Sequence, residues 1–330
     1  MEQQRKPKIP WKRIIGGAFL VLLVLAIAFI GFANYAYYSV LPASLPCRNC
    51  SGDAQAIHVD GFDLYYREMG PAADLVPVVM LHGGPGHSSW SFKQGFDFLA
   101  RSHRVIYYDQ RGSGNSQIKP DSSLYTIDQL VEELESIRRD VIRTDKIIVV
   151  GHSAGGALAQ RYALAYPEHV ERMILVSSIW INNGVGLPLL WDVFSPILYA
   201  LGPGFPPSNP EKADEWFSKL NLSTSLPRLS DPANRSLIED SGYISFATWR
   251  EVSRSLEGSD FSGELRKLQV KTLVMYGAAD ADATGKANAA AICDLLPDCT
   301  LAGFDRSGHW PFLEEPEKFE EVITSFFSGR

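Results

Sequence analysis

A serine at the centre of a glycine-rich pentapeptide is the side chain best placed for nucleophilic chemistry. The segment 151–155, Gly-His-Ser-Ala-Gly, follows an apolar strand predicted over 146–150 and opens a helix predicted over 155–165. A Gly-x-Ser-x-Gly segment between a buried strand and a helix is typical of a nucleophile elbow, whose tight turn needs small residues around the serine. Gly151, Gly155 and Gly156 meet this need. Ser153 is the predicted nucleophile, and an ordinary glycine-rich turn is the alternative.

A serine hydroxyl needs a base to take its proton, and the base needs an acid to orient it. His309 alone among the seven histidines follows the last predicted strand, in the segment Ser-Gly-His-Trp-Pro at 307–311. Asp280 follows the preceding predicted strand, and Asp282 is the alternative two residues later. The order serine, acid, histidine is typical of nucleophiles placed on such elbows. The predicted catalytic residues are therefore Ser153, Asp280 and His309.

A glycine-rich loop follows the apolar run 76–81 and reads His-Gly-Gly-Pro-Gly over 82–86. Such a loop lets backbone N–H groups converge on the oxyanion that develops when a carbonyl is attacked, and each donor contributes about 3–4 kcal/mol. The predicted donors are the amides of Gly84 and Ala154. We expect His82 to hold the loop rather than act as a second base. A plain turn is the alternative.

The predicted catalytic residues and oxyanion donors can meet only if the strands that precede them end at the same edge of one sheet. Apolar runs alternate with helical patterns along residues 55–330, which predicts an α/β fold with a mostly parallel, eight-stranded sheet flanked by helices. Asp60-Gly61 marks a hairpin between the first two strands. The predicted strands are 56–59, 63–67, 76–81, 105–108, 146–150, 173–177, 270–276 and 300–304, and the predicted helices are 126–141, 155–165 and 316–327.

One long stretch interrupts the alternation. Residues 179–268 contain no strong strand pattern, and they hold many prolines and four of the seven tryptophans. We interpret this stretch as a helical cap, inserted into a core formed by 55–178 and 269–330. An aromatic core of the cap explains its tryptophans as well as a substrate pocket would.

The N-terminal segment suggests a membrane. Five Lys and Arg residues against one Glu occupy 1–13, and residues 14–33 contain no charged side chain. About 20 apolar residues span a bilayer core of roughly 30 Å. We predict a basic cytoplasmic head over 1–13, a transmembrane anchor over 14–36 that binds the lipid bilayer, and a tether over 37–54. The positive-inside rule then places the catalytic domain outside the cytoplasm. A cleaved signal peptide is the alternative.

Composition and motifs argue against several other classes of protein and partner. The net charge is −7 and 45% of the residues are hydrophobic, which excludes a disordered chain and argues against a nucleic-acid partner. Dinucleotide-type glycine motifs, His-Glu-x-x-His and clustered Cys/His sites do not occur, so we expect no cofactor and no metal. The pairs Cys47/Cys50 and Cys293/Cys299 could each close a local disulfide in an oxidising compartment.

The sequence resembles the α/β-hydrolase fold family over about 55–330, and within it the proline iminopeptidase branch. The segments 82–86 and 109–116 (Asp-Gln-Arg-Gly-Ser-Gly-Asn-Ser) carry the resemblance to that branch. The elbow departs from the Gly-Gly-Ser-Trp-Gly usual there. The resemblance implies that acidic residues of the cap hold the free amino group of the substrate, for which Glu239 and Glu251 are candidates. Trp180 would suit an apolar acyl or prolyl pocket.

Together these features predict a membrane-anchored serine hydrolase that acts through an acyl-enzyme on small esters or amides. A proline iminopeptidase-like aminopeptidase competes with a carboxylesterase or lactonase. The expected partner is a small-molecule or short-peptide substrate. A non-catalytic binding module of the same fold is the hypothesis from another class, although such modules often lose a member of the triad. Epoxide hydrolases and dehalogenases of this fold use an aspartate where Ser153 stands, which disfavours both.

Overall fold

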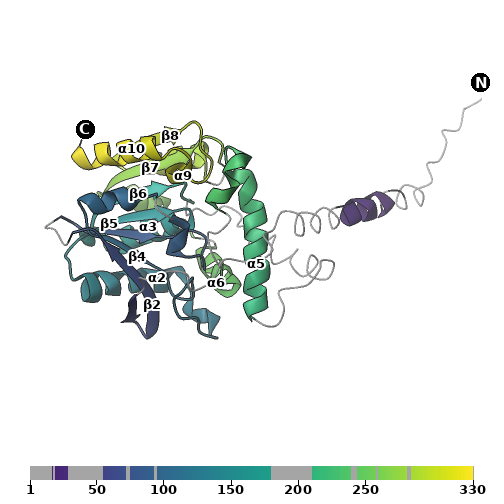
Figure 1. Ribbon diagram of the computed structural model, residues 1–330, viewed down its shortest axis with the longest axis horizontal. Coiled ribbons are helices and arrows are strands. Elements are labelled where there is room, and N and C mark those ends of the chain that lie inside the picture. Colours follow the sequence, from purple (N-terminus) through teal and green to yellow (C-terminus); the bar gives the residue numbers. More distant parts are fainter. Residues whose placement is uncertain are drawn as a thin grey trace, which may run out of the picture.

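The computed structural model describes residues 17, 19–28, 55–71, 75–92, 95–179, 210–238, 244–257, 259–280 and 284–329 (Figure 1). Eight strands form one sheet, in agreement with the predicted number. Their bounds are β1 Gln55–Val59, β2 Phe62–Met69, β3 Val78–Leu81, β4 Val105–Tyr108, β5 Ile147–His152, β6 Val170–Val176, β7 Lys271–Gly277 and β8 Cys299–Phe304.

The sheet has the order β1-β2-β4-β3-β5-β6-β7-β8. Strand β2 pairs antiparallel with β1 and β4, and the pairs from β4 through β8 are parallel. The register pairs Leu81 with Gly151 and Gly277 with Phe304, so the carboxyl ends of these strands lie along one edge. The predicted mostly parallel, eight-stranded sheet is confirmed.

Helices cover both faces of the sheet, and side chains alternate between them along each strand. Val79 and Val149 pack in one apolar cluster with α2, α3 and α8, whereas Met80 and Val150 pack in a second cluster with α10. The helices of the described chain are α2 Ile127–Ser136, α3 Ala154–Ala165, α5 Pro210–Ser225, α6 Phe246–Leu256, α7 Ser262–Leu265, α8 Lys286–Leu295, α9 Pro311–Glu314 and α10 Pro316–Ser328. Short 3-10 segments are η1 Ser89–Phe92, η2 Asp97–Arg101, η3 Ser122–Leu124, η5 Pro167–His169, η6 Leu226–Arg228 and η7 Pro232–Leu237.

The helix predicted over 126–141 forms with one difference. Thr126 and Gln129 make a capping box at its start, as S/T-x-x-E/Q patterns do. The α-helix ends at Ser136, and the segment η4, Ile137–Ile142, continues it as a π-helix. There the Arg138 guanidinium donates to the carbonyl oxygens of Thr144 and Asp145 beyond the helix.

The described residues between β6 and β7 include the helices α5, α6 and α7 and the 3-10 segments η6 and η7. Helices α5 and α6 pack through Phe217, Ile244 and Phe246, and the rings of Trp216 and Trp249 lie against this cluster. In Figure 1, α5 stands beside one end of the sheet. These two tryptophans therefore supply an aromatic core for the helical segment, which is one of the two roles considered from the sequence, the other being a substrate pocket.

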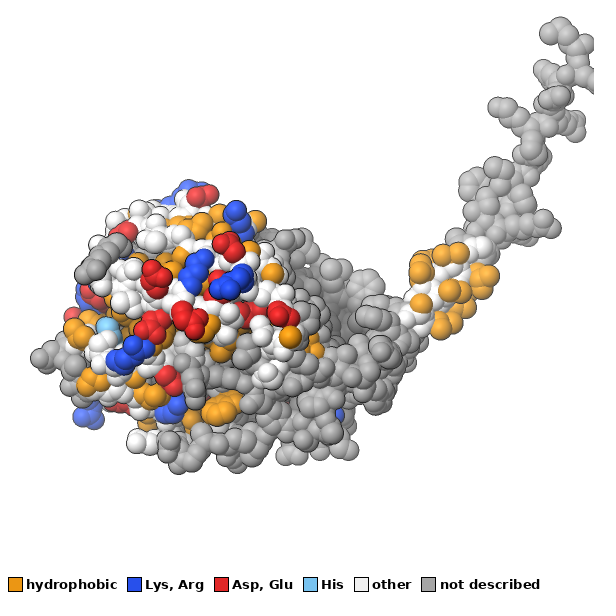
Figure 2. All heavy atoms as spheres, turned by 45° about the horizontal axis from the view of Figure 1, so that its top comes forward, with side chains coloured by type: hydrophobic (Ala, Val, Ile, Leu, Met, Phe, Trp, Pro, Cys, Tyr) orange, Lys and Arg blue, Asp and Glu red, His pale blue; other side chains and the backbone are white. Residues whose placement is uncertain are grey.

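The predicted membrane-spanning anchor over 14–36 is wrong. From that range the structure describes residue 17 and residues 19–28, drawn as the short purple helix in Figure 1. None of the described helices is both long enough and apolar enough to cross a membrane. The large apolar side chains among residues 19–28 are exposed (Figure 2), with Phe19 at 69%.

The expectations that depended on the anchor change with it. The bilayer as a partner and the single-pass topology, with the catalytic domain outside the cytoplasm, are corrected by the same finding. The predicted basic head over 1–13 and tether over 37–54 lie outside the described residues, as do Cys47 and Cys50. Cys293 and Cys299, at the end of α8 and the start of β8, form a disulfide.

Candidate active site

Ser153 occupies a strained turn between β5 and α3. Its backbone has φ 55° and ψ −119°, a region that residues with a Cβ rarely adopt. A Cβ on Gly155 would overlap the carbonyl oxygen of Leu81, and a Cβ on Gly151 would overlap the backbone of Gly155. Glycine is therefore required on both sides of the serine for steric reasons. The geometry is that of the predicted nucleophile elbow.

The glycine loop after β3 lies directly against this turn. A Cβ on Gly83 would stand 2.9 Å from the Cβ of Ser153 and 2.8 Å from the carbonyl oxygen of His152. Gly84 follows with φ 46°, a left-handed conformation that suits glycine. Ala154 is the first residue of α3, and the first N–H groups of a helix have no partner within it. The two predicted oxyanion donors thus lie on segments that meet at Ser153.

A buried network fixes the shape of the glycine loop. His82 Nε2 accepts a hydrogen bond from the Gln110 N–H at 3.1 Å, and the Gln110 side chain donates to the His82 carbonyl at 3.2 Å. Burial lowers the pKa of His82 to about 4, so its ring is neutral at pH 7. The Asp109 carboxylate accepts from the Ser89 N–H and hydroxyl, each at 2.7 Å, and from the Asn115 N–H at 2.8 Å. These contacts agree with the structural role predicted for His82.

Asp280 and His309 form a buried pair at the same edge of the sheet. His309 Nδ1 lies 2.8 Å from Asp280 Oδ2, and the side chains are 5% and 0% exposed. Asp280 follows β7, and His309 lies between β8 and α9. The two loops touch, because a Cβ on Gly277 would overlap the carbonyl oxygen of Gly308. The structure thus brings together the acid and base that the sequence predicted from distant segments.

The electrostatics of this pair favour a carboxylate beside a neutral imidazole. Burial opposes the charge of Asp280, yet the hydrogen bond and charge of His309, together with the charge of Arg228, hold the pKa of Asp280 well below its usual 3.8. Burial lowers the pKa of His309 below its usual 6.5, and the nearby Arg228 charge acts in the same direction. The neighbouring carboxylate opposes that shift only in part.

His152 links the base to the elbow, a role that the sequence did not indicate. Its Nε2–H donates to the His309 carbonyl at 2.9 Å, and the two rings lie 4.7 Å apart between centroids. Burial lowers the pKa of His152 well below 6.5, which keeps its ring neutral. Ser153 and His309 are both described residues, and the structure gives no hydrogen bond between the serine hydroxyl and the imidazole.

Arg228 is a second site residue that sequence reasoning missed. It ends η6, within the helical segment between β6 and β7, and its guanidinium reaches the acid–base pair. The Nη2 atom lies 3.0 Å from Asp280 Oδ1, 2.7 Å from Thr284 Oγ1 and 2.6 Å from His309 Nδ1. The His309 N–H also donates to the Arg228 carbonyl at 2.9 Å. No local motif signals this contact, because it depends on packing between segments.

Of the three predicted substrate-binding residues, the structure describes Glu251. Trp180 and Glu239 lie outside the described residues, as does Asp282. Glu251 lies on α6, where its carboxylate is 2.9 Å from Arg250 Nη2 and 3.7 Å from Arg254 Nη1. The charge of Glu251 is therefore balanced by arginines of its own helix.

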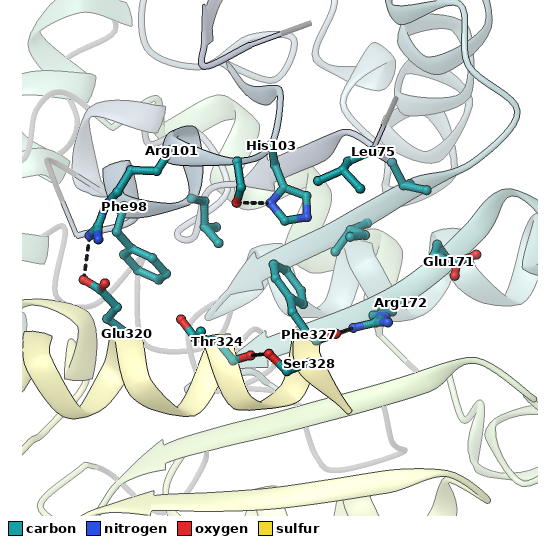
Figure 3. Close-up of a pocket in the computed structure, with 14 residues that line it drawn as sticks. Leu75, Phe98, Arg101, His103, Glu171, Arg172, Glu320, Thr324, Phe327 and Ser328 are labelled. Atoms are coloured by element: carbon teal, nitrogen blue, oxygen red, sulfur yellow. Dashed lines mark hydrogen bonds and ion pairs between the residues drawn. The ribbon is translucent and has the colours of Figure 1, made fainter. Parts of the chain in front are cut away.

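A cavity of about 580 Å³ lies elsewhere on the molecule (Figure 3). Its walls include Val76, Ile148 and Arg172, at the amino ends of β3, β5 and β6, and Phe327 near the end of α10. An ion pair of 2.9 Å between Arg101 and Glu320 crosses its rim. Ser153, Asp280 and His309 follow the carboxyl ends of their strands, so this cavity belongs to the opposite edge of the sheet.

The sequence matches known proteins over most of its length. Residues 76–316 match the family described as alpha/beta hydrolase fold. A proline iminopeptidase from Saccharolobus solfataricus is 30% identical over 286 residues, covering 81% of this chain and 89% of that protein. A proline iminopeptidase from Heyndrickxia coagulans is 31% identical, covering 83% of this chain and 98% of that protein.

Solved structures share the architecture at lower identity. An enol-lactonase from Burkholderia xenovorans superposes with a TM-score of 0.67 at 20% identity, covering 83% of this chain and all of that chain. A thermophilic esterase from Thermogutta terrifontis gives a TM-score of 0.67 at 19% identity, covering 84% and 98% of the two chains. At these identities the likeness concerns the fold alone.

Proposed function

Because the chain belongs to the α/β-hydrolase fold family, we propose that it hydrolyses small amides or esters through an acyl-enzyme formed on Ser153. It is an enzyme of that family, related to the proline iminopeptidases. The observation that carries the proposal is a juxtaposition at one edge of the sheet. There the strained turn at Ser153 meets the glycine loop, and the buried Asp280–His309 pair lies beside it.

In each half of the proposed reaction His309 acts first as a base and then as an acid. His309 Nε2 takes the hydroxyl proton of Ser153 as the oxygen attacks the substrate carbonyl carbon. The resulting oxyanion accepts hydrogen bonds from the amides of Gly84 and Ala154. The imidazolium, stabilised by the Asp280 carboxylate, then protonates the departing amine or alcohol, and the acyl-enzyme remains. Water, deprotonated by His309, attacks the ester carbonyl, and the proton returns to Ser153 as the acid leaves.

The substrate class we propose first is a peptide or amide with a free N-terminal proline or similar residue. The segments 82–86 and 109–116 and the two proline iminopeptidases support this choice. Such a substrate needs an apolar pocket, for which Trp180 is our candidate, and an acidic partner for its amino group. Glu239 is the stronger acidic candidate, because Glu251 already balances arginines of α6.

A carboxylesterase or lactonase is the alternative, and the elbow favours it. The sequence has Ala154 after the nucleophile, where the proline iminopeptidase pattern has tryptophan. The smaller side chain changes the wall beside the reacting carbonyl.

One experiment separates the possibilities. The full chain is assayed with a prolyl arylamide, the same arylamide blocked at its amino group, and a short-chain aryl ester. Ser153→Ala is the test variant and Ser123→Ala, at an exposed 3-10 turn, is the matched control. Cleavage of the free arylamide alone supports the aminopeptidase, and cleavage of the ester alone supports the esterase. If Ser153→Ala still hydrolyses either substrate, or still reacts with a fluorophosphonate probe as the wild type does, the proposal fails.

A further inference from the structure

The contact between Arg228 and the acid–base pair gives His309 Nδ1 more hydrogen-bond neighbours than it can bind at once. His309 Nδ1 has two neighbours within hydrogen-bond distance, Asp280 Oδ2 at 2.8 Å and Arg228 Nη2 at 2.6 Å. A neutral imidazole nitrogen carries either one hydrogen or one lone pair in the ring plane. It can donate to the carboxylate or accept from the guanidinium, and it cannot do both at once.

The two choices differ in their consequence for catalysis. With the proton on Nδ1, donated to Asp280, the Nε2 lone pair is free to take the proton of Ser153. With Arg228 donating to Nδ1, the proton sits on Nε2 and the ring cannot act as a base towards the serine. A guanidinium has no acceptor atom, so its 2.6 Å contact with Nδ1 is a hydrogen bond only in the second arrangement.

We propose that Arg228 is a positioning residue that competes with Asp280 for Nδ1 of His309. Seated as in this structure, it holds His309 in the tautomer that cannot activate Ser153, and its withdrawal releases the base. The inference rests on the proposed function and adds to it a coupling between the helical segment 210–268 and the chemistry.

The surroundings tie Arg228 to the segment that carries His309. The Arg228 carbonyl accepts the His309 N–H at 2.9 Å, so side chain and backbone of one arginine bracket the histidine. Two residues on, the Ser230 N–H donates to Glu314 at 2.8 Å, and Glu314 also accepts the Gly308 N–H at 2.7 Å. These bonds hold η6 against the segment that carries His309, so the withdrawal proposed here is a movement of the Arg228 side chain.

The titratable and charged groups that face this histidine come from several elements. They are Asp280 after β7, Arg228 from η6 and the neutral His152 at the end of β5. Glu314 of α9 and Glu315 bind the neighbouring residues, through the Gly308 N–H and the Ser307 hydroxyl. Among the described residues Arg228 is the cation in direct contact, and its charge acts to lower the pKa of His309. A positive charge here also opposes the imidazolium that the reaction must form.

The test compares Arg228→Met, which keeps the aliphatic stem and removes the charge, with Arg228→Lys, which keeps the charge and changes the donor geometry. Arg266→Met is the control, because Arg266 is an exposed arginine of the same segment. The first readout is the ring ¹⁵N spectrum of the full chain labelled at histidine, with His309 assigned by His309→Gln. It reports tautomer and titration without any substrate.

For Arg228→Met we expect the His309 proton to move from Nε2 to Nδ1 and its titration midpoint to rise by about one pH unit. We expect kcat in the pH-independent range to rise about tenfold, and the acid limb of kcat/KM to follow the titration midpoint. Arg228→Lys should fall between wild type and Arg228→Met, and it carries the test if Arg228→Met does not fold. Arg266→Met should match wild type.

The proposal is overturned if the His309 ring shows Nδ1–H in the wild type, or if tautomer and titration are the same in wild type and Arg228 variants. A fall in kcat with an unchanged ring spectrum also overturns it, since that is the result of a merely structural ion pair. If the ring responds as expected while no variant hydrolyses any substrate, the proposed function fails and the assignment of Arg228 stands.

Discussion

The substitution Asp280→Asn tests the acid–base pair most directly, because it changes one charge and almost no shape. The Asp280 side chain is fully buried, with Oδ2 2.8 Å from His309 Nδ1. Its Oδ1 lies 3.0 and 3.3 Å from two nitrogens of Arg228. An asparagine at 280 has one acceptor oxygen, and the guanidinium donors would take it. The amide NH₂ would then face His309, so Nδ1 would have no acceptor for a proton even when Arg228 withdraws.

That geometry sets the size of the effect. A base that can no longer reach the active tautomer, beside a site that no longer stabilises the imidazolium, loses on the order of 10³–10⁴ in kcat. The loss corresponds to about 4–5.5 kcal/mol of transition-state stabilisation. It should be measured as kcat on the better of the arylamide and ester substrates, and again as the rate of fluorophosphonate labelling at Ser153. The thermal midpoint of each variant shows whether the fold survives.

Asp282→Asn is the matched control for this experiment. Asp282 was the alternative acid in the sequence and lies outside the described residues. We expect Asp282→Asn to retain activity within about threefold of wild type, a difference of about 0.7 kcal/mol. A folded Asp280→Asn protein with activity within tenfold of wild type would refute the assignment of Asp280. A large loss in Asp282→Asn alone would move the acid to that residue.

Three further predictions follow from the geometry. Gly155→Ala should lower the free energy of unfolding, measured by urea denaturation, by about 3 kcal/mol, because the new Cβ overlaps the Leu81 carbonyl oxygen. It should also abolish fluorophosphonate labelling of Ser153. The control Gly263→Ala, whose Cβ meets nothing within 4 Å, should have neither effect. The reaction needs the neutral form of His309. Because burial lowers the pKa of His309, that form persists as the pH falls through 6.5, and the acid limb of the kcat/KM profile should have its midpoint below pH 6.5. A midpoint above 6.5 contradicts this prediction. Replacing both cysteines of the Cys293–Cys299 disulfide by serine should lower the free energy of unfolding by about 2 kcal/mol, as expected for so short a loop, with urea denaturation of both proteins as the measurement.

The parts that the sequence predicted well depend on local rules. Buried parallel strands are continuous apolar runs, so β3, β5 and β7 could be located without tertiary information. The elbow could be predicted because steric exclusion leaves glycine as the residue that fits at 151 and 155. Asp280 and His309 follow from the position of loops after strands, since those loops meet where parallel strands end.

The features that could not be predicted from the sequence depend on contacts between distant segments or on where a helix begins and ends. Arg228 reaches Asp280 from a helical segment whose packing no periodicity describes. The anchor was inferred from a run of apolar residues, and hydropathy measures composition alone. None of the described helices is both long enough and apolar enough to cross a membrane. Helix α8 carries a modest signal, with Ala289 and Ile292 buried three residues apart, that a closer search for helical spacing could find.

Two residues of the segment 109–116, which carries part of the resemblance to proline iminopeptidases, use their side chains to bind the protein itself. Asp109 uses its carboxylate to bind Ser89 and Asn115, and Gln110 holds His82 from both sides. The bonds of Gln110 hold His82, two residues before Gly84, whose amide is the proposed oxyanion donor, and any reaction that passes through an oxyanion needs such a donor. Proline selectivity must then come from residues that touch the substrate's ring and amino group. For this reason the comparison of free and blocked arylamide, rather than the presence of these segments, decides between aminopeptidase and esterase.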